Sequence, residues 1–197
     1  FSRKFYEDNG FFLKKGGLEI CRKDDDARWE ELKRKVSSGK AFGSNVKLIS
    51  AAEAKEKFPL LEEDSMRGAM WDPDAGLVIP RSQDVVSFAV ESAKEKGALK
   101  TFTDTPALDF EIENGHIVGV KTDKGIIKTK KVVIASGIWG PLMGKKAGVS
   151  VPLMPLEHPL LFFGPLPEAQ GAEDFLIYPL LRDQGNSAYV RDTGRLH

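Results

Sequence analysis

Apolar residues recur with the period of a strand in some stretches of the chain and with that of a helix in others. Residues 18–21 alternate, and Val-Lys-Leu-Ile at 46–49 has the composition of a strand, so both stretches predict strands. Between them, apolar residues within 29–36 recur at helical spacing. Aspartates at 24–26 are suited to cap this helix, and Ser-Ser-Gly at 37–39 is a stop signal.

Two further helices have clear boundary signals. Ser50 and Glu53 have the spacing of a capping box, which predicts a short helix from residue 51 onward. The clearest helix begins at Ser82 or Asp84, has an apolar stripe along one face, and is followed by Gly97 at its C-terminal end.

A three-stranded meander is predicted after this helix. Residues 107–113 and 117–122 alternate around Asn114-Gly115, the strongest short hairpin signal, and Ile126-Ile127 follows a second turn. The chain therefore folds back on itself twice in this region.

The rest of the chain mixes apolar runs with proline and glycine. Residues 132–135 form a continuous apolar run that is typical of a strand buried on both faces. Gly137 ends this run, and a short helix to about Ala147 follows. From residue 151 the chain is expected to be extended, with strand-like pieces at 160–163 and 188–192. Together these elements predict an α+β fold, an antiparallel or mixed sheet with helices, with one strand of α/β type.

Composition narrows the class of protein. The 197 residues contain 29 basic and 29 acidic side chains, and no basic stripe points to nucleic acid as a partner. No apolar run approaches the roughly 20 residues needed to span a membrane. The single cysteine, Cys21, excludes an internal disulfide and a cysteine-rich metal site, so we expect an inert buried thiol, no metal, and a reducing, cytoplasm-like compartment.

Four motifs occur in an order that resembles a known family. They are Asp-Pro-Asp-Ala-Gly-Leu-Val-Ile-Pro at 72–80, the segment 131–140 ending Ala-Ser-Gly-Ile-Trp-Gly, 151–158, and 181–191. Over nearly the whole chain they resemble the D-amino-acid-oxidase-like family of FAD-dependent oxidoreductases. Within that family they are similar to the branch of dimethylglycine oxidase and sarcosine dehydrogenase.

The resemblance implies a division into parts of two domains. Residues 1–80 and 148–197 would form two parts of a substrate-binding domain, and residues 81–147 a partial FAD-binding α/β portion. The G-x-G-x-x-G loop that opens the family's FAD-binding domain has no match here, and neither do the family's C-terminal strands. We expect both to lie outside these residues, and we expect these residues alone to bind FAD weakly.

His158 is the first candidate for chemistry. Strand alternation would place it on one face with Leu160 and Phe162. An imidazole with an ordinary pKa near 6.5 accepts a proton around neutrality, and amine oxidation requires an unprotonated substrate nitrogen. From residue context alone, a hydrogen-bonded histidine at a sheet rim is the more common situation. The resemblance instead implies a catalytic histidine in the active site.

Tyr189 and Arg191 are two residues apart, so one strand face would present both. The resemblance implies that Tyr189 is a catalytic tyrosine. A guanidinium at Arg191 could bind a substrate carboxylate through two hydrogen bonds. The alternative for Arg191 is a surface ion pair with Asp183 or Asp192.

Five residues are predicted to bind the cofactor because of the resemblance. The family's backbone passes close to FAD after the strand that matches 132–135, which implies contacts from Ala135, Ser136 and Gly137. Trp139 is a further candidate, with core packing between the two domains as the alternative. Ala107 matches a position that touches the adenine side of FAD.

The resemblance thus implies an FAD-dependent enzyme that oxidises a small amine or amino acid, such as dimethylglycine, sarcosine or proline, by hydride transfer to flavin. Two alternatives stay open. One keeps the fold and changes the substrate to glycerol 3-phosphate or another hydroxy compound. The other is a non-catalytic binding module that kept the fold. The sequence does not fix the oligomeric state.

Overall fold

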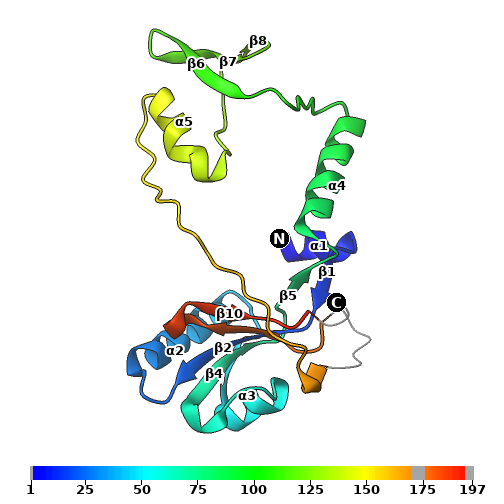
Figure 1. Ribbon diagram of the computed structural model, residues 1–197, viewed down its shortest axis with the longest axis vertical. Coiled ribbons are helices and arrows are strands. Elements are labelled where there is room, and N and C mark those ends of the chain that lie inside the picture. Colours follow the sequence, from blue (N-terminus) through cyan, green and yellow to red (C-terminus); the bar gives the residue numbers. More distant parts are fainter. Residues whose placement is uncertain (1, 170–175, 194–197) are drawn as a thin grey trace. The chain divides into compact units, whose positions relative to one another are not determined.

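The computed structural model of the chain describes residues 2–169 and 176–193 (Figure 1). The chain forms two compact units. The first, which we call the sheet unit, comprises Phe1–Ser92 together with Phe163–His197, and the second, the meander unit, comprises Ala93–Phe162. The division at residues 80 and 147 into parts of a substrate domain and an FAD-binding domain stays a prediction, because compactness alone does not assign a unit to either domain.

The sheet unit is built on a five-stranded mixed sheet. Its central strand pairs antiparallel with one neighbour and parallel with the other. In spatial order the strands are β10 (Ala188–Val190), β9 (Leu180–Asp183), β2 (Gly17–Arg22), β4 (Met66–Asp72) and β3 (Lys47–Ser50). A separate antiparallel pair consists of β1 (Phe12–Lys14) and β5 (Gly76–Val78).

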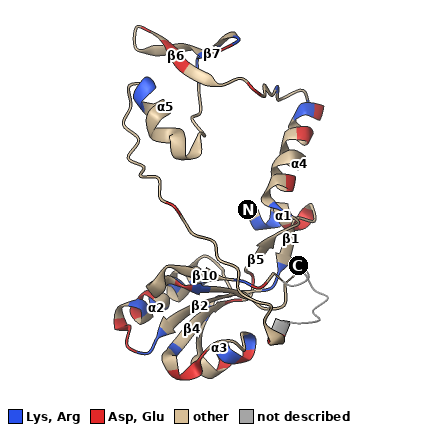
Figure 2. Cartoon of the chain, viewed as in Figure 1, with Lys and Arg blue, Asp and Glu red and all other residues tan. Residues whose placement is uncertain are grey.

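The helices and short 3-10 turns of the described residues lie mainly in this unit. Those of the sheet unit are α1 (Ser2–Asp8), α2 (Asp26–Ala41), α3 (Ala51–Lys57), most of α4 (Ser82–Glu95, which continues into the meander unit from Ala93), and the turns η1 (Glu63–Ser65), η3 (Pro167–Ala169) and η4 (Gln184–Asn186). None of the described helices is both long and apolar enough to cross a membrane. Lys and Arg are mixed with Asp and Glu along α2 and α3 (Figure 2).

Side chains along β2 alternate between the two faces of the sheet. One face packs against α3 and the other against α2. Leu18 and Ile20 belong to an apolar core that includes Ala54 of α3. On the other face, the ring of Trp29 in α2 packs against Gly68 of β4, where an added Cβ would lie 3.0 Å from it. The predicted strand therefore lies in the middle of three layers, and hydrophobic burial on both faces stabilises it.

Local capping signals in the sequence are confirmed. The Asp25 side chain accepts a hydrogen bond from the backbone N–H of Arg28 at the start of α2, and Ser50 and Glu53 form a reciprocal capping box at α3. The predicted stop at 37–39 is wrong, because α2 continues to Ala41. Gly39 lies within the helix, and a Cβ there would come within 2.5 Å of the Val46 side chain. This glycine makes room for the chain that enters β3.

Cys21 is a structural thiol, as the sequence predicts. It is 1% exposed on β2, and burial raises the pKa of its thiol above the ordinary value.

The meander unit contains β6 (Ala107–Glu113), β7 (His116–Thr122) and β8 (Gly125–Lys128), which pair antiparallel in chain order. Asn114 and Gly115 have φ of 50° and 78°, as a type I′ hairpin turn requires. A 3-10 turn, η2 (Gly137–Trp139), and α5 (Gly140–Lys146) follow. The α+β fold class, with its meander and short final helix, is confirmed.

Two predicted strands are absent from the described residues. Residues 132–135 are irregular, with Val133 90% exposed, and residues 160–163 are irregular and exposed as well. An apolar run favours burial, but a strand also requires a neighbour for its backbone hydrogen bonds. No described strand of this chain pairs with either run.

Asp74 links three segments of the sheet unit. Its carboxylate contacts Lys14 at 2.5 Å and Arg3 at 3.4 Å, and accepts a hydrogen bond from the Asn45 amide at 2.8 Å. The Lys14 hydrogen bond, followed by that of Asn45, lowers the pKa of Asp74 to about 2 from its ordinary value of 3.8.

Asp74→Asn should therefore remove stability that is present above pH 3.8 and is lost as the pH falls through about 2. Thermal unfolding midpoints of the two proteins should differ at pH 5 and converge at the acidic end of this window. Asp64→Asn, at an exposed acid of η1, serves as the control. A gap between wild type and Asp74→Asn that stays constant down to pH 2 would contradict this assignment.

Candidate functional site

A groove of about 850 Å³ lies within the meander unit. It is bounded by the strands β6 and β7, by the irregular segment before η2, and by α5. Its lining residues are Pro106, Ala107, Phe110, Val120, Val132, Val133, Ile134, Ala135, Ser136, Gly137, Trp139, Leu142 and Met143.

All five residues predicted to contact the cofactor line this one groove. Ala107 comes from β6, Ala135 and Ser136 from the irregular segment, and Gly137 and Trp139 from η2. Trp139 is 62% exposed, so its side chain is not packed in a core within its own unit. These positions are up to 32 residues apart in sequence, and the fold of the meander unit brings them together.

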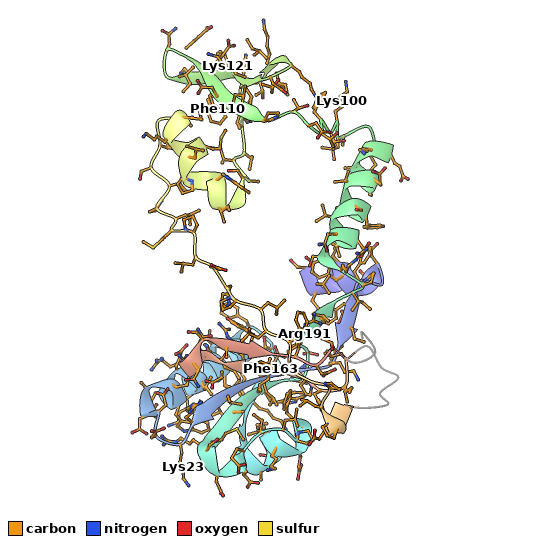
Figure 3. The ribbon with its side chains drawn as sticks, in the orientation of Figure 1. Lys23, Lys100, Phe110, Lys121, Phe163 and Arg191 are labelled. Atoms are coloured by element: carbon orange, nitrogen blue, oxygen red, sulfur yellow. The ribbon has the colours of Figure 1, made fainter. Side chains whose placement is uncertain are left out.

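Sequence reasoning missed the apolar side of the groove. Phe110, labelled in Figure 3, and Val120 are paired across β6 and β7, so their side chains lie on one face of the meander. Phe110 is 6% exposed, while α5 contributes Leu142 and Met143. The strand alternation at 107–113 contained this signal, since it marks which residues share a face.

The groove has the character of a site for a flat, largely apolar group. Ligand sites of this size are usually lined by apolar side chains with a few polar groups. Here Ser136 Oγ is buried and has no hydrogen-bond partner among the described residues, so it can donate to or accept from a ligand. Gly137 has a φ of +55° and no atom within 4 Å of where a Cβ would be, so its backbone is open to close approach. These residues fit the flat ring system of FAD.

Gly137→Ala should destabilise the protein by about 1–2 kcal/mol, because a residue with a Cβ is strained at positive φ. Gly137→Asn should cost less, since asparagine tolerates the left-handed region better than alanine. Denaturant unfolding of the three proteins measures this order. Equal stability of wild type and Gly137→Ala would show that the backbone here relaxes to negative φ.

His158 lies in the meander unit, in the irregular and exposed stretch after α5. The predicted strand alternation with Leu160 and Phe162 is wrong, because this stretch forms no strand. His158 is not among the residues that line the groove.

Tyr189 and Arg191 lie in the sheet unit. Tyr189 is on β10, which ends at Val190, and Arg191 follows the strand (Figure 3). The prediction that one strand face presents both side chains is therefore wrong. The two acids considered as partners of Arg191 make other contacts. Asp183 lies 3.5 Å from Arg22 Nη2, and Asp192 accepts hydrogen bonds from backbone N–H groups.

The predicted site residues thus fall into two sets. The groove and His158 belong to the meander unit, and Tyr189 and Arg191 belong to the sheet unit. In residues 2–169 and 176–193 no group of three or more His, Cys, Asp or Glu side chains could hold a metal ion.

Comparison with known proteins places this chain among flavoenzymes. A family model described as FAD dependent oxidoreductase matches residues 2–197. Mitochondrial sarcosine dehydrogenase of Homo sapiens is 30% identical over 98% of this chain and 21% of its own length. The crystal structure of L-proline dehydrogenase from P. horikoshii superposes with a TM-score of 0.75 at 33% identity, over 98% of this chain and 50% of that one.

One relative is named as a regulatory subunit and not as an oxidoreductase. The mitochondrial pyruvate dehydrogenase phosphatase regulatory subunit of Mus musculus is 30% identical over 75% of this chain and 16% of its own length. The chain spans 21% and 16% of the length of these two curated relatives.

Proposed function

This chain belongs to the FAD dependent oxidoreductase family, and from that membership we propose that the protein oxidises a secondary or N-methylated amino acid such as sarcosine, dimethylglycine or proline. The observation that carries the proposal is the single groove lined by all five predicted cofactor contacts. The names of two relatives, sarcosine dehydrogenase and L-proline dehydrogenase, support this substrate class, because sarcosine and proline are both secondary amines.

The groove residues would hold FAD. Ala135, Ser136 and Gly137 offer backbone groups and one unpartnered hydroxyl, while Trp139 and Ala107 offer apolar surface. When bound, FAD supplies the acceptor for the hydride that leaves the substrate.

The remaining roles belong to three polar side chains. His158 would take the proton from the substrate ammonium, so that the nitrogen lone pair becomes available. Tyr189 would orient the amine through its hydroxyl, and Arg191 would pair with the substrate carboxylate. The one cysteine of these 197 residues is buried and forms no disulfide, which supports the proposal of a reducing, cytoplasm-like compartment.

Anaerobic titration of the full-length protein tests the proposal. The protein should purify with FAD, and its visible flavin band should bleach on addition of sarcosine, dimethylglycine or proline. Glycerol 3-phosphate should be titrated in the same way for comparison. If it bleached the flavin band in preference to any amine, the protein would be assigned to the hydroxy-compound alternative.

A non-catalytic module is the second candidate, and the similarity to a phosphatase regulatory subunit favours it. The same titration separates it from an enzyme. Full-length protein that purifies without flavin, and that reduces no dye with sarcosine, dimethylglycine or proline after FAD is added, would support the module and exclude the enzyme.

A further inference from the structure

Three side chains form a continuous row across adjacent strands of the sheet unit. Glu19 on β2 is directly opposite Arg182 on β9, and Arg182 is directly opposite Tyr189 on β10. Residues paired in this way present their side chains on the same face of a sheet. The row therefore runs from the buried centre of the sheet to its edge strand.

The inner end of the row is a buried carboxylate surrounded by cations. Glu19 is 5% exposed, and its Oε1 lies 2.6 Å from Lys35 Nζ and 3.9 Å from Arg28 Nη1, both on α2. Its Oε2 lies 4.0 Å from Arg182 Nη1. Because Lys35 already makes a close pair with Glu19, Arg182 is attracted to the carboxylate without being its main partner.

The middle of the row is a guanidinium held by two contacts. Arg182 Cζ lies 5.0 Å from the centroid of the Tyr189 ring, within the range of a cation–π contact. Arg182 Nε is buried and has no hydrogen-bond partner in the described part of the chain. The orientation of the guanidinium plane therefore depends on Glu19 on one side and the Tyr189 ring on the other.

We propose that Glu19 and Arg182 are positioning residues that fix the ring of Tyr189. Tyr189 is 62% exposed at a sheet edge, where an aromatic side chain with little packing around it can adopt more than one rotamer. A cation stacked on the ring favours one of them and thereby fixes the direction of the hydroxyl. This inference rests on the proposed function only where it assigns a role in turnover, since the stack itself does not depend on the reaction.

Fluorotyrosine labelling of the full-length protein tests the stack directly. Tyr189→Phe assigns the fluorine resonance of position 189, and Arg182→Met should shift and broaden that resonance. Glu19→Gln should change it in the same direction, provided that this variant folds. Arg67→Met is the matched control, because Arg67 stacks on a different ring, that of Trp29, at 5.4 Å. A resonance unchanged by Arg182→Met would overturn the proposal whether or not the protein is an enzyme.

A double-mutant cycle tests the role in turnover. Arg182→Met should lower kcat/KM for the best amine roughly fivefold or more, but by less than twofold when Tyr189→Leu has already removed the ring. Arg67→Met should lower kcat/KM by less than twofold in both backgrounds. Additive losses for Arg182→Met and Tyr189→Leu would mean that Arg182 acts independently of Tyr189. A wild type with no amine oxidation would remove the proposed function, while the fluorine result would still decide the stack.

Discussion

His158→Ala in the full-length protein is expected to lower kcat on the best amine substrate by roughly 10²–10⁴-fold, the usual contribution of a general base. At neutral pH the substrate nitrogen is mostly protonated, and a residue that removes this proton determines how much substrate can react. The same variant should unfold at nearly the wild-type denaturant concentration, because His158 is exposed in an irregular stretch and contributes little packing.

The control for this prediction is the other described histidine. His116 is exposed at the start of β7, next to the hairpin turn, so His116→Ala should leave both kcat and stability close to wild type. If His158→Ala unfolded the protein, the histidine would have a structural role. If it retained full turnover across the pH range, His158 would not be the base.

Asp192→Ala is expected to destabilise the protein by about 3 kcal/mol. The two carboxylate oxygens of Asp192 accept hydrogen bonds from the backbone N–H groups of Ile177 and Tyr178, each at 2.8 Å. These bonds tie the end of β10 to the segment that enters β9, next to Leu176, which is fully buried. Hydrogen bonds to a charged acceptor contribute about 1.5–3 kcal/mol each, and the variant leaves both N–H groups without a partner.

Denaturant unfolding at neutral pH measures this loss. Asp192→Asn should cost about half as much, because an amide has one acceptor oxygen where the carboxylate has two. Asp123→Ala, in the exposed turn between β7 and β8, should change stability by less than about 0.5 kcal/mol. A loss of under 1 kcal/mol for Asp192→Ala would show that water replaces the carboxylate at both donors.

Local sequence signals predicted most of the elements, because each depends on near neighbours. The capping box at Ser50 and Glu53, the hairpin at Asn114 and Gly115, and the alternation of β2 all need only a few adjacent residues. The apolar run at 132–135 misled the prediction, since its strand would require a partner that no described residue provides.

The candidate site could be predicted only in part. The cofactor residues came from matched motifs, and the structure places all five on one groove. Arg182 and Glu19 were missed because nothing in the sequence indicates that β2 pairs with β9 in parallel, 163 residues apart at this register. Their connection to Tyr189 follows only from long-range strand pairing, which a one-dimensional pattern does not contain.

A crystal structure of the full-length protein with FAD and a non-reactive amino-acid analogue is the most direct test of this account. We expect the isoalloxazine ring to contact the backbone at Ala135–Gly137, with His158 and Tyr189 within hydrogen-bonding distance of the analogue's nitrogen. A flavin bound away from the groove, or an analogue that touches neither His158 nor Tyr189, would contradict the account.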